Sequence, residues 1–285
     1  MQTPLHFGNA PRRVPLSLQV VNFFNGFSQI GWLVFGFGMI FFWAFCSNAD
    51  LSFLTFRGTH ETVEGRVTEV KATGASENDV QVRANHYQYS VAGNLLTGTS
   101  YSTGERVDPG ETVTVEYDED DPARSRIEGM RRAMFGPAVL FVTIFPFIGL
   151  VLLIPAMITG LRRNRILRDG LVANGRLISK SPTNVTVNHR PLYELRFEFT
   201  SRDGRRCEAK ARTTDTARLE DESQEPLLYD PADPTRAYLL DDAPARPEFE
   251  PNGDLRGNTA HAIRMLMLPA IVIGAHGLVL WMKMT

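Results

Sequence analysis

The sequence predicts a membrane protein of mixed α and β structure, in which three transmembrane helices accompany two small antiparallel β domains. The first observation is that three long apolar runs contain no Asp, Glu, Lys or Arg, although these residues make up 22% of the chain. The second is that the two regions between the runs share the same motifs in the same order. About five short strands in each region favour a sandwich or an open barrel.

The three apolar runs have the length of membrane-spanning helices. A bilayer core about 30 Å thick requires about 20 apolar residues in a helix, whereas a helix on a soluble protein shows a polar face. We therefore expect transmembrane helices at residues 30–46, at 133–160 and within the C-terminal segment 259–285. The first run begins too late for a cleavable signal peptide, and the semi-apolar residues 20–27 before it are expected to lie at the membrane interface.

The spans divide the rest of the chain. We expect an N-terminal segment at residues 1–29, a first β domain at 47–132 and a second β domain with its linker at 161–258. Within the last of these, residues 241–258 are rich in Pro, Asp and Glu, and they are expected to be the linker to the third span.

Proline, glycine and histidine are the unusual residues inside the runs. Three prolines in the second run indicate either a hinge or gate or, as the favoured interpretation, a bent packing helix: Pro137, Pro146 and Pro155. Glycines that would allow close helix contact are Gly36, Gly38, Gly274 and Gly277. His276 is a candidate for proton or ligand binding because ionisable side chains are costly in a membrane, but its closeness to Lys283 also fits a position near the interface.

The two regions between the spans indicate a duplicated domain of about 70 residues. Gly65-Arg66-Val67 in the first matches Gly175-Arg176-Leu177 in the second. The motif Y-D-x-x-D-P-x-R follows in both, at residues 117–124 and at 229–236. The opening motifs are 110 positions apart and the closing motifs 112, and this agreement makes chance similarity a poor explanation.

Both copies have the pattern of β structure. The segments TVEGRVTEV, HYQYSVAG, ETVTVEY and LYELRFEF alternate apolar and polar residues, which predicts half-buried strands. Turns are expected at residues 92–94, 108–110 and 203–204. The second copy departs from the first at residues 221–226, where a mobile acidic loop is expected in place of the start of a strand.

Arginine placement predicts the orientation, because Lys and Arg near the spans favour the cytoplasmic side. Basic residues precede the first span and follow the second at Arg12, Arg13, Arg162, Arg163, Arg165 and Arg168. The segment after the first span, SNADLSFLTF, has none. We therefore expect a cytoplasmic N-terminus, the first β domain outside and the second inside. The arginines before the second span oppose this orientation: Arg126, Arg131 and Arg132.

No arrangement of reactive side chains predicts a catalytic, cofactor or metal site. Cys46 and Cys207 lie far apart, so neither a disulfide framework nor a zinc site is indicated. His60-Glu61 begins H-E-x-x-E and not the zinc-binding H-E-x-x-H. The other histidines have no ligand partners at useful spacing: His86, His189 and His261.

Two short runs of charged residues each allow a functional and a structural interpretation. The run Asp118-Glu119-Asp120-Asp121 lacks the glycine and the distant glutamate of an EF-hand, and a strand-ending turn is the favoured interpretation. The basic run at 162–165 is equally consistent with anionic lipid headgroups as ligands and with a simple topology anchor.

The order G-x-V, Y-x-[VF]-x-[YF], a turn glycine and V-x-V-x-Y-D-P-x-x-P resembles a bacterial membrane-protein family catalogued as a domain of unknown function. A first helix similar to that of the family runs from Gly31-Trp32 to Phe42, and the two copies extend the resemblance over nearly the whole chain. Glu119 departs from the usual proline of the motif, whereas Pro231 keeps it. The resemblance implies a multi-pass protein of the bacterial cell membrane and no known catalytic residues.

The leading hypothesis is a non-enzymatic membrane protein whose β domains bind a partner or stabilise an envelope assembly. Its expected partners are the lipid bilayer and a protein or a second copy of the chain, with no cofactor. Near-neutral charge gives no reason to expect nucleic acid. The alternative is an oligomeric small transporter or channel subunit, motivated by His276 and the prolines of the second span. An enzyme with a site shared by the domains is the weakest hypothesis, because the expected topology separates them.

Overall fold

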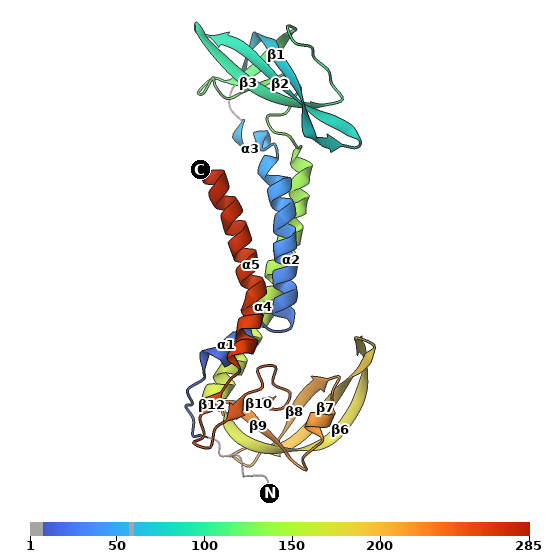
Figure 1. Ribbon diagram of the computed structural model, residues 1–285, viewed down its shortest axis with the longest axis vertical. Coiled ribbons are helices and arrows are strands. Elements are labelled where there is room, and N and C mark those ends of the chain that lie inside the picture. Colours follow the sequence, from blue (N-terminus) through green and yellow to red (C-terminus); the bar gives the residue numbers. More distant parts are fainter. Residues whose placement is uncertain (1–7, 57–59) are drawn as a thin grey trace. The chain divides into compact units, whose positions relative to one another are not determined.

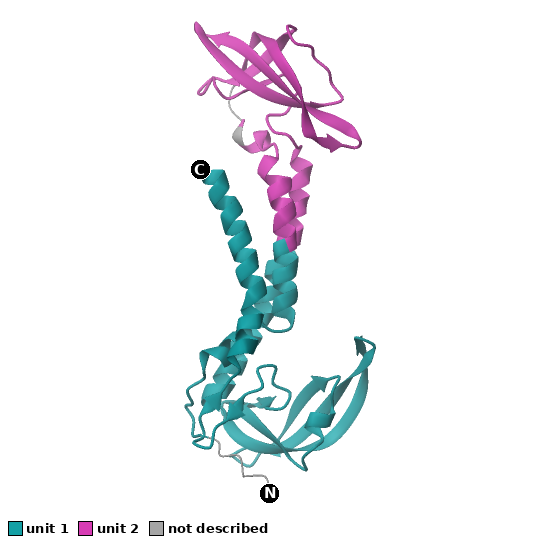
Figure 2. Cartoon of the chain, viewed as in Figure 1, with its two compact units in different colours: residues 1–36, 148–285 teal, residues 37–147 magenta. Residues whose placement is uncertain are grey.

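The computed structural model describes residues 8–56 and 60–285, so the first seven residues of the expected N-terminal segment lie outside the described part. The chain contains both α-helices and β-strands, which are labelled in Figure 1. The chain divides into two compact units, one of residues 1–36 and 148–285 and the other of residues 37–147 (Figure 2). Each unit contains one five-stranded β domain.

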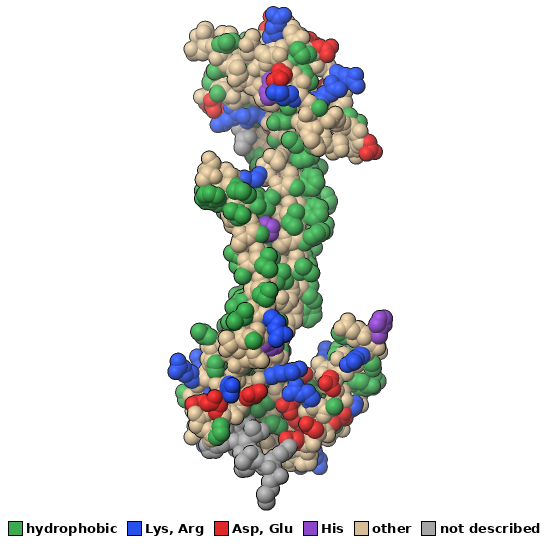
Figure 3. All heavy atoms as spheres, viewed as in Figure 1, with side chains coloured by type: hydrophobic (Ala, Val, Ile, Leu, Met, Phe, Trp, Pro, Cys, Tyr) green, Lys and Arg blue, Asp and Glu red, His purple; other side chains and the backbone are tan. Residues whose placement is uncertain are grey.

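Three helices are long and apolar enough to span a membrane. The first span combines α2 (Phe27–Ala44) with the short turn Cys46–Asn48, the second combines the 3₁₀ turn Pro137–Thr143 with α4 (Ile144–Asp169), and the third is α5 (Thr259–Met284). Hydrophobic side chains cover these helices, whereas charged side chains gather over the β domains (Figure 3). The sequence placed the end of the second span at residue 160, but α4 continues to Asp169, so the basic run at 162–165 is helical.

The prolines of the second span have ordinary helical positions. Pro137 opens the 3₁₀ turn, and Pro146 lies in the first turn of α4, directly after the 3₁₀ turn ends at Thr143. Only Pro155 lies in the helix interior. Pro146 therefore lies where the span changes from 3₁₀ to α geometry, and Pro155 lies inside a continuous α-helix.

Glycines set the close helix contacts, but not all of those that the sequence predicted. A methyl group on Gly149 would overlap the backbone of Phe35, and one on Gly31 would meet the side chain of Leu153. Gly36 is tight against Val272, and Gly38 against Pro146, as expected. The prediction was wrong for Gly274 and Gly277, where an added methyl group would meet no atom within 4 Å of the described structure.

The first β domain is a single curled antiparallel sheet. Its order is β3-β2-β1-β4-β5, with the strands β1 (His60–Glu77), β2 (Val80–Val91), β3 (Asn94–Thr103), β4 (Thr112–Asp118) and β5 (Ser125–Ile127). The outer strands β3 and β5 come into contact, as in small open barrels of the OB type. The core consists of inward side chains such as Val67, Tyr87 and Val115. Of the two architectures expected from the sequence, the domain is therefore the open barrel.

The second β domain repeats this strand order. Read from its other edge, the sheet is β8-β7-β6-β9-β10, with β6 (Leu171–Val187), β7 (Arg190–Thr200), β8 (Arg206–Thr213), β9 (Glu225–Asp230) and β10 (Asp233–Leu239). The outer strands β8 and β10 again meet. A strand begins at Glu225, within the segment 221–226 that the sequence assigned to an acidic loop.

The two sheets also share their irregularities. In β1 the pairing with β2 shifts after Val67 and again after Ala72, and in β6 the pairing with β7 shifts after Leu177 and again after Pro182. The hairpin turns that follow have positive φ at both central residues, Asn78-Asp79 in one and Asn188-His189 in the other. Two positive φ angles give the tight turn that matches strand twist. Bulges and turns lie 110 positions apart throughout.

The N-terminal segment belongs to the core of the second domain. Helix α1 (Leu16–Phe24) buries Leu18 and Val21 in one cluster with Leu167 of α4 and Leu228 of β9. Residues 20–27, expected from the sequence to form an interfacial segment, comprise the end of α1 at Phe24 and the start of α2 at Phe27. The apolar face of α1 is buried against the second domain and α4.

Residues 241–258 are likewise more than a linker. They bury Ala243, Ala245 and Leu255 in the same cluster as α1. A small hairpin of β11 (Glu248–Phe249) and β12 (Leu255–Arg256) forms within them. The connection to α5 is therefore packed against the second domain.

Candidate functional site

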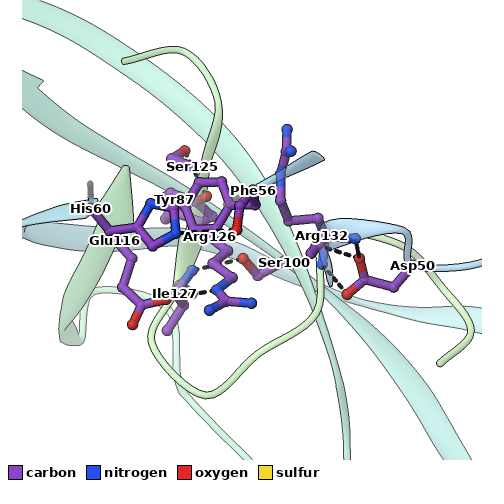
Figure 4. Close-up of polar contacts among 11 residues, drawn as sticks. Asp50, Phe56, His60, Tyr87, Ser100, Glu116, Ser125, Arg126, Ile127 and Arg132 are labelled. Atoms are coloured by element: carbon purple, nitrogen blue, oxygen red, sulfur yellow. Dashed lines mark hydrogen bonds and ion pairs between the residues drawn. The ribbon is translucent and has the colours of Figure 1, made fainter. Parts of the chain in front are cut away.

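A polar and aromatic cluster fixes the first β domain to the segment that leaves the first span (Figure 4). The ring of Phe56, after the short helix α3 (Ser52–Thr55), stacks on the imidazole of His60 with centroids 3.8 Å apart. The guanidinium carbons of Arg126 and Arg132 lie 5.0 and 5.6 Å from the centre of the Phe56 ring. Asp50 accepts a hydrogen bond of 3.2 Å from the backbone N–H of Arg132. The cluster holds the two ends of the domain together.

The arginines before the second span are all engaged within the first domain. Arg126 pairs with Glu116 at 2.6 Å, and Arg131 pairs with Glu77 at 2.7 Å. Burial alone would raise the pKa of Glu77, but hydrogen bonds from Arg131 and Thr103 outweigh burial and hold that pKa below its ordinary value. These arginines therefore have a structural use that is independent of topology.

The acidic run of the first domain forms a turn. Asp118 accepts a backbone hydrogen bond from Asp120 at 3.1 Å and pairs with Arg124 at 3.3 Å. In the second copy Asp230 accepts the equivalent bond from Ala232 at 2.9 Å. The repeated aspartate thus caps its own turn in both domains, which agrees with the turn interpretation.

The histidines and cysteines within residues 8–56 and 60–285 form no common cluster. His86 bonds to the hydroxyl of Thr99 at 2.9 Å. His276 of α5 bonds to the carbonyl oxygen of Gly36 in α2 at 3.1 Å. His189 occupies a hairpin turn, and the backbone N–H of His261 bonds to Asn258 at the start of α5. Both cysteines are free thiols, Cys46 buried and Cys207 partly exposed. His276 therefore takes part in helix packing, which weakens the motive for a transport role.

Sequence reasoning missed a buried acidic cluster in the second domain. Glu225 is 2% exposed, and neither of its carboxylate oxygens has a hydrogen-bond partner among the described residues. Burial, followed by the negative charges of Asp241, Asp221 and Glu222, raises the pKa of Glu225 to about 7. Burial also raises the pKa of Asp241, although Arg218 lies 3.9 Å away. Burial and mutual repulsion thus make the ionised form of these carboxyl groups unfavourable.

Two hollows border this region of the second domain and the adjoining helix ends. One, of about 1030 Å³, reaches Asp241 and is lined by Arg218, Asp242, Arg256, His261 and Arg264 among others. The other, of about 1200 Å³, combines arginines with exposed apolar side chains and includes Arg13, Leu16, Leu161 and Arg165. The second hollow has the mixed basic and apolar lining expected for contact with anionic headgroups.

Comparison with known proteins assigns the first domain alone. Residues 63–132, from β1 through β5 to the start of the second span, match the family model described as "Domain of unknown function (DUF3592)". No curated protein matches the chain, and no solved structure matches it. The chain therefore contains a domain of unknown function together with three candidate membrane helices.

Proposed function

We propose that the chain is a multi-pass protein of the bacterial cell membrane that displays two duplicated β barrels on opposite faces of the bilayer and acts by binding rather than by catalysis. Its partners are the lipid bilayer and a protein of the envelope or a second copy of the chain. The N-terminus and the second domain are cytoplasmic, and the first domain is outside.

Matching register supports duplication as the origin of the domains. A bulge inserts a residue on one strand and changes the local twist, and two unrelated five-stranded sheets have no reason to place two bulges and a tight turn at the same intervals. The shifts after Val67 and Ala72 have counterparts after Leu177 and Pro182. Shared strand order adds to this argument.

The packing of α1 is the observation that carries the two-sided arrangement. Leu18 of α1 is fully buried in a cluster with Leu228 and Tyr238 of the second domain, so the N-terminal segment and that domain lie on the same face. Two candidate spans separate them along the chain. A helix in lipid satisfies its backbone hydrogen bonds internally and can cross completely. If both spans cross, the first domain, which lies between them, is on the other face.

Arginine placement supports the orientation. Arg162 and Arg165 follow the second span on the same side as Arg12 and Arg13, which is the cytoplasmic side by the positive-inside rule. The opposing arginines before the second span are those bound to Glu116, to Glu77 and over the ring of Phe56, and their presence is explained by these contacts.

Exposed apolar side chains support a binding role. On β6 the side chains of Ile178, Val185 and Val187 are each exposed by more than two fifths. Val185 and Val187 lie two residues apart and therefore share one face of the strand. Exposed apolar groups on a long hairpin are suited to contact with another protein. The transporter alternative has no comparable support. His276 bonds to a backbone carbonyl oxygen of α2, and two of the three prolines lie at the starts of helical segments.

Thiol labelling at matched positions tests the arrangement. Ser90 and Thr200 are exposed and occupy equivalent positions, 110 apart, in β2 and β7. In a background with Cys46→Ser and Cys207→Ser, Ser90→Cys is expected to react with an impermeant maleimide in intact cells. Thr200→Cys, like the native Cys207, is expected to react only after the membrane is opened.

Three outcomes are distinguishable. The expected pattern supports both the two-sided arrangement and its orientation. The reverse pattern keeps the two-sided arrangement and inverts the orientation. Equal labelling of the two positions in intact cells, or equal protection of both, rejects the two-sided arrangement.

A further inference from the structure

Glu225 is a clear chemical difference between the two copies at an inward position of a central strand. In the first domain Gly65 of β1 pairs with Val113 of β4, and in the second Gly175 of β6 pairs with Glu225 of β9. Side chains two residues apart on a strand point to the same face. Glu225 therefore points inward with Leu227 and Tyr229, both of which belong to the core of the domain. A carboxylate has replaced a valine in an apolar position.

The carboxylate of Glu225 meets two others from separate parts of the chain. Asp221 lies in the loop before β9 and Asp241 lies just after β10, and oxygen atoms of all three residues lie within 4.8 Å of one another. The three differ in exposure: Glu225 is buried, Asp241 is partly buried and Asp221 is exposed. The cluster thus has a buried floor and an open side.

The positive charge near the cluster does not neutralise it. Arg218 reaches Asp241 at 3.9 Å, which is a loose ion pair. Lys180 is held by Glu220 at 2.7 Å and by Thr216 at 2.9 Å. Neither contact reaches the oxygens of Glu225, which have no hydrogen-bond partner among the described residues. Buried charges in proteins are paired or coordinate metals, and the described residues supply no partner for the ionised carboxylate of Glu225.

We propose that Asp221, Glu225 and Asp241 form a binding site for a hard divalent cation, and that Ca²⁺ fits it best. Carboxylate oxygens are the ligands that Mg²⁺, Ca²⁺ and Mn²⁺ prefer. Ca²⁺ binds oxygen at about 2.3–2.6 Å, so ligands on opposite sides of the ion are about 5 Å apart. Oxygen atoms of the three residues lie within 4.8 Å of one another, which is inside that span, so one such ion can reach all three. Mg²⁺ demands a near-ideal octahedral geometry and loses its water ligands reluctantly, which suits it less to three carboxylates from separate segments.

The cation links three separate segments of the second domain. Its ligands tie the loop before β9 and the segment after β10 to the start of β9 itself. Asp241 also borders the hollow that is lined by Arg256 and by Arg264 of α5. Occupancy of the site therefore orders the rim of this hollow next to the third span.

Direct binding of ⁴⁵Ca²⁺ to the full chain, purified in detergent, tests the proposal, with thermal unfolding as a second readout. Glu225→Val restores the residue of the first copy, so the barrel is expected to remain folded. Asp241→Asn removes a ligand without changing the buried floor. Asp215→Asn is the matched control, because Asp215 is an exposed acidic residue near the same loop and outside the cluster.

The wild type and Asp215→Asn are expected to bind one Ca²⁺ per chain and to unfold at a higher temperature when it is added. Glu225→Val is expected to lose binding and the thermal shift, and Asp241→Asn to weaken binding at least tenfold. Excess Mg²⁺ is expected to compete weakly. Absence of binding to the wild type, or equal binding by the wild type and Glu225→Val, overturns the proposal. If Glu225→Val proves unfolded by circular dichroism, unchanged binding by Asp241→Asn overturns it instead.

Discussion

The guanidinium of Arg12 donates a hydrogen bond of 2.7 Å to the carbonyl oxygen of Gly170. A second bond from the same group reaches the carbonyl oxygen of Leu167, at 3.5 Å. The last carbonyl groups of a helix have no partner within the helix, and here an arginine from the N-terminal segment caps the end of α4. Arg12 is buried, whereas its neighbour Arg13 is exposed.

Replacement of Arg12 by alanine is expected to destabilise the second domain. A buried acceptor that loses its partner costs about 1–3 kcal/mol, so the unfolding free energy should fall by about that amount. Denaturant unfolding of the purified chain in detergent measures it. Arg13→Ala removes the same charge from an exposed position and should change the unfolding free energy little. Equal loss in both variants would attribute the effect to charge and not to the cap.

Replacement of Phe56 by alanine is expected to loosen the first domain. Phe56 is 6% exposed and contacts His60, Arg126 and Arg132. Loss of a buried phenylalanine costs about 3–5 kcal/mol. Limited proteolysis should then cleave the first domain faster and leave the second unchanged. Phe53→Ala, at a neighbouring position that is half exposed, is the control, and equally fast cleavage in that variant would contradict the anchoring role.

The stability of the second domain should fall as pH rises in the presence of EDTA. The pKa of Glu225 is about 7 in the folded domain, against 4.5 for the ordinary value. The folded state therefore binds the proton more tightly than the unfolded state. The contribution of Glu225 to the unfolding free energy should be largest below pH 4.5 and decrease, by up to about 1.4 kcal/mol per pH unit, until pH 7.

Thermal unfolding between pH 5 and pH 8 measures this dependence. Glu225→Gln removes the titrating group, so its unfolding temperature should vary less with pH than that of the wild type. A wild-type domain that gains stability between pH 5 and pH 7 would show that the carboxylate is better solvated than its burial indicates.

Replacement of Gly149 by alanine is expected to destabilise the contact between α2 and α4. The added methyl group overlaps the backbone of Phe35, and overpacking of this kind costs about 1–3 kcal/mol. Gly277→Ala is the matched control in α5. Its methyl group meets open space, and alanine is a better helix former than glycine. Thermal stability in detergent should fall for the first variant only, and an equal effect of both would argue against the close contact.

Patterns that are local in the chain predicted most of the fold. Absence of charge over a long run identified the candidate spans, and alternation identified β1, β2, β4 and β7. The positive φ at Gly204 fits the turn expected from Asp203-Gly204. The repeated motif predicted two domains of one kind, and the two sheets share one strand order.

Long-range packing accounts for what the sequence did not predict. Nothing near Leu18 shows that its partners are Leu167 and Leu228, more than a hundred positions away. Gly31 and Gly149 pack closely while Gly274 does not, although all three lie in similar apolar surroundings. The choice depends on which helix faces meet. The burial of Glu225 was open to prediction, since aligning the copies by Tyr117 and Tyr229 places it opposite Val113.

The two domains differ in length in the connections between their strands. Ser90 and Leu95 pair across four intervening residues, whereas Thr200 and Arg206 pair across five. The other additional residue falls between β8 and β9, in the loop that contains Asp221. A shift of one residue within a strand would turn its whole inner face outward. The additional residues of the second domain lie only in its connections, so the same positions face the core in both sheets, and Glu225 takes the place of Val113 without a change of strand register.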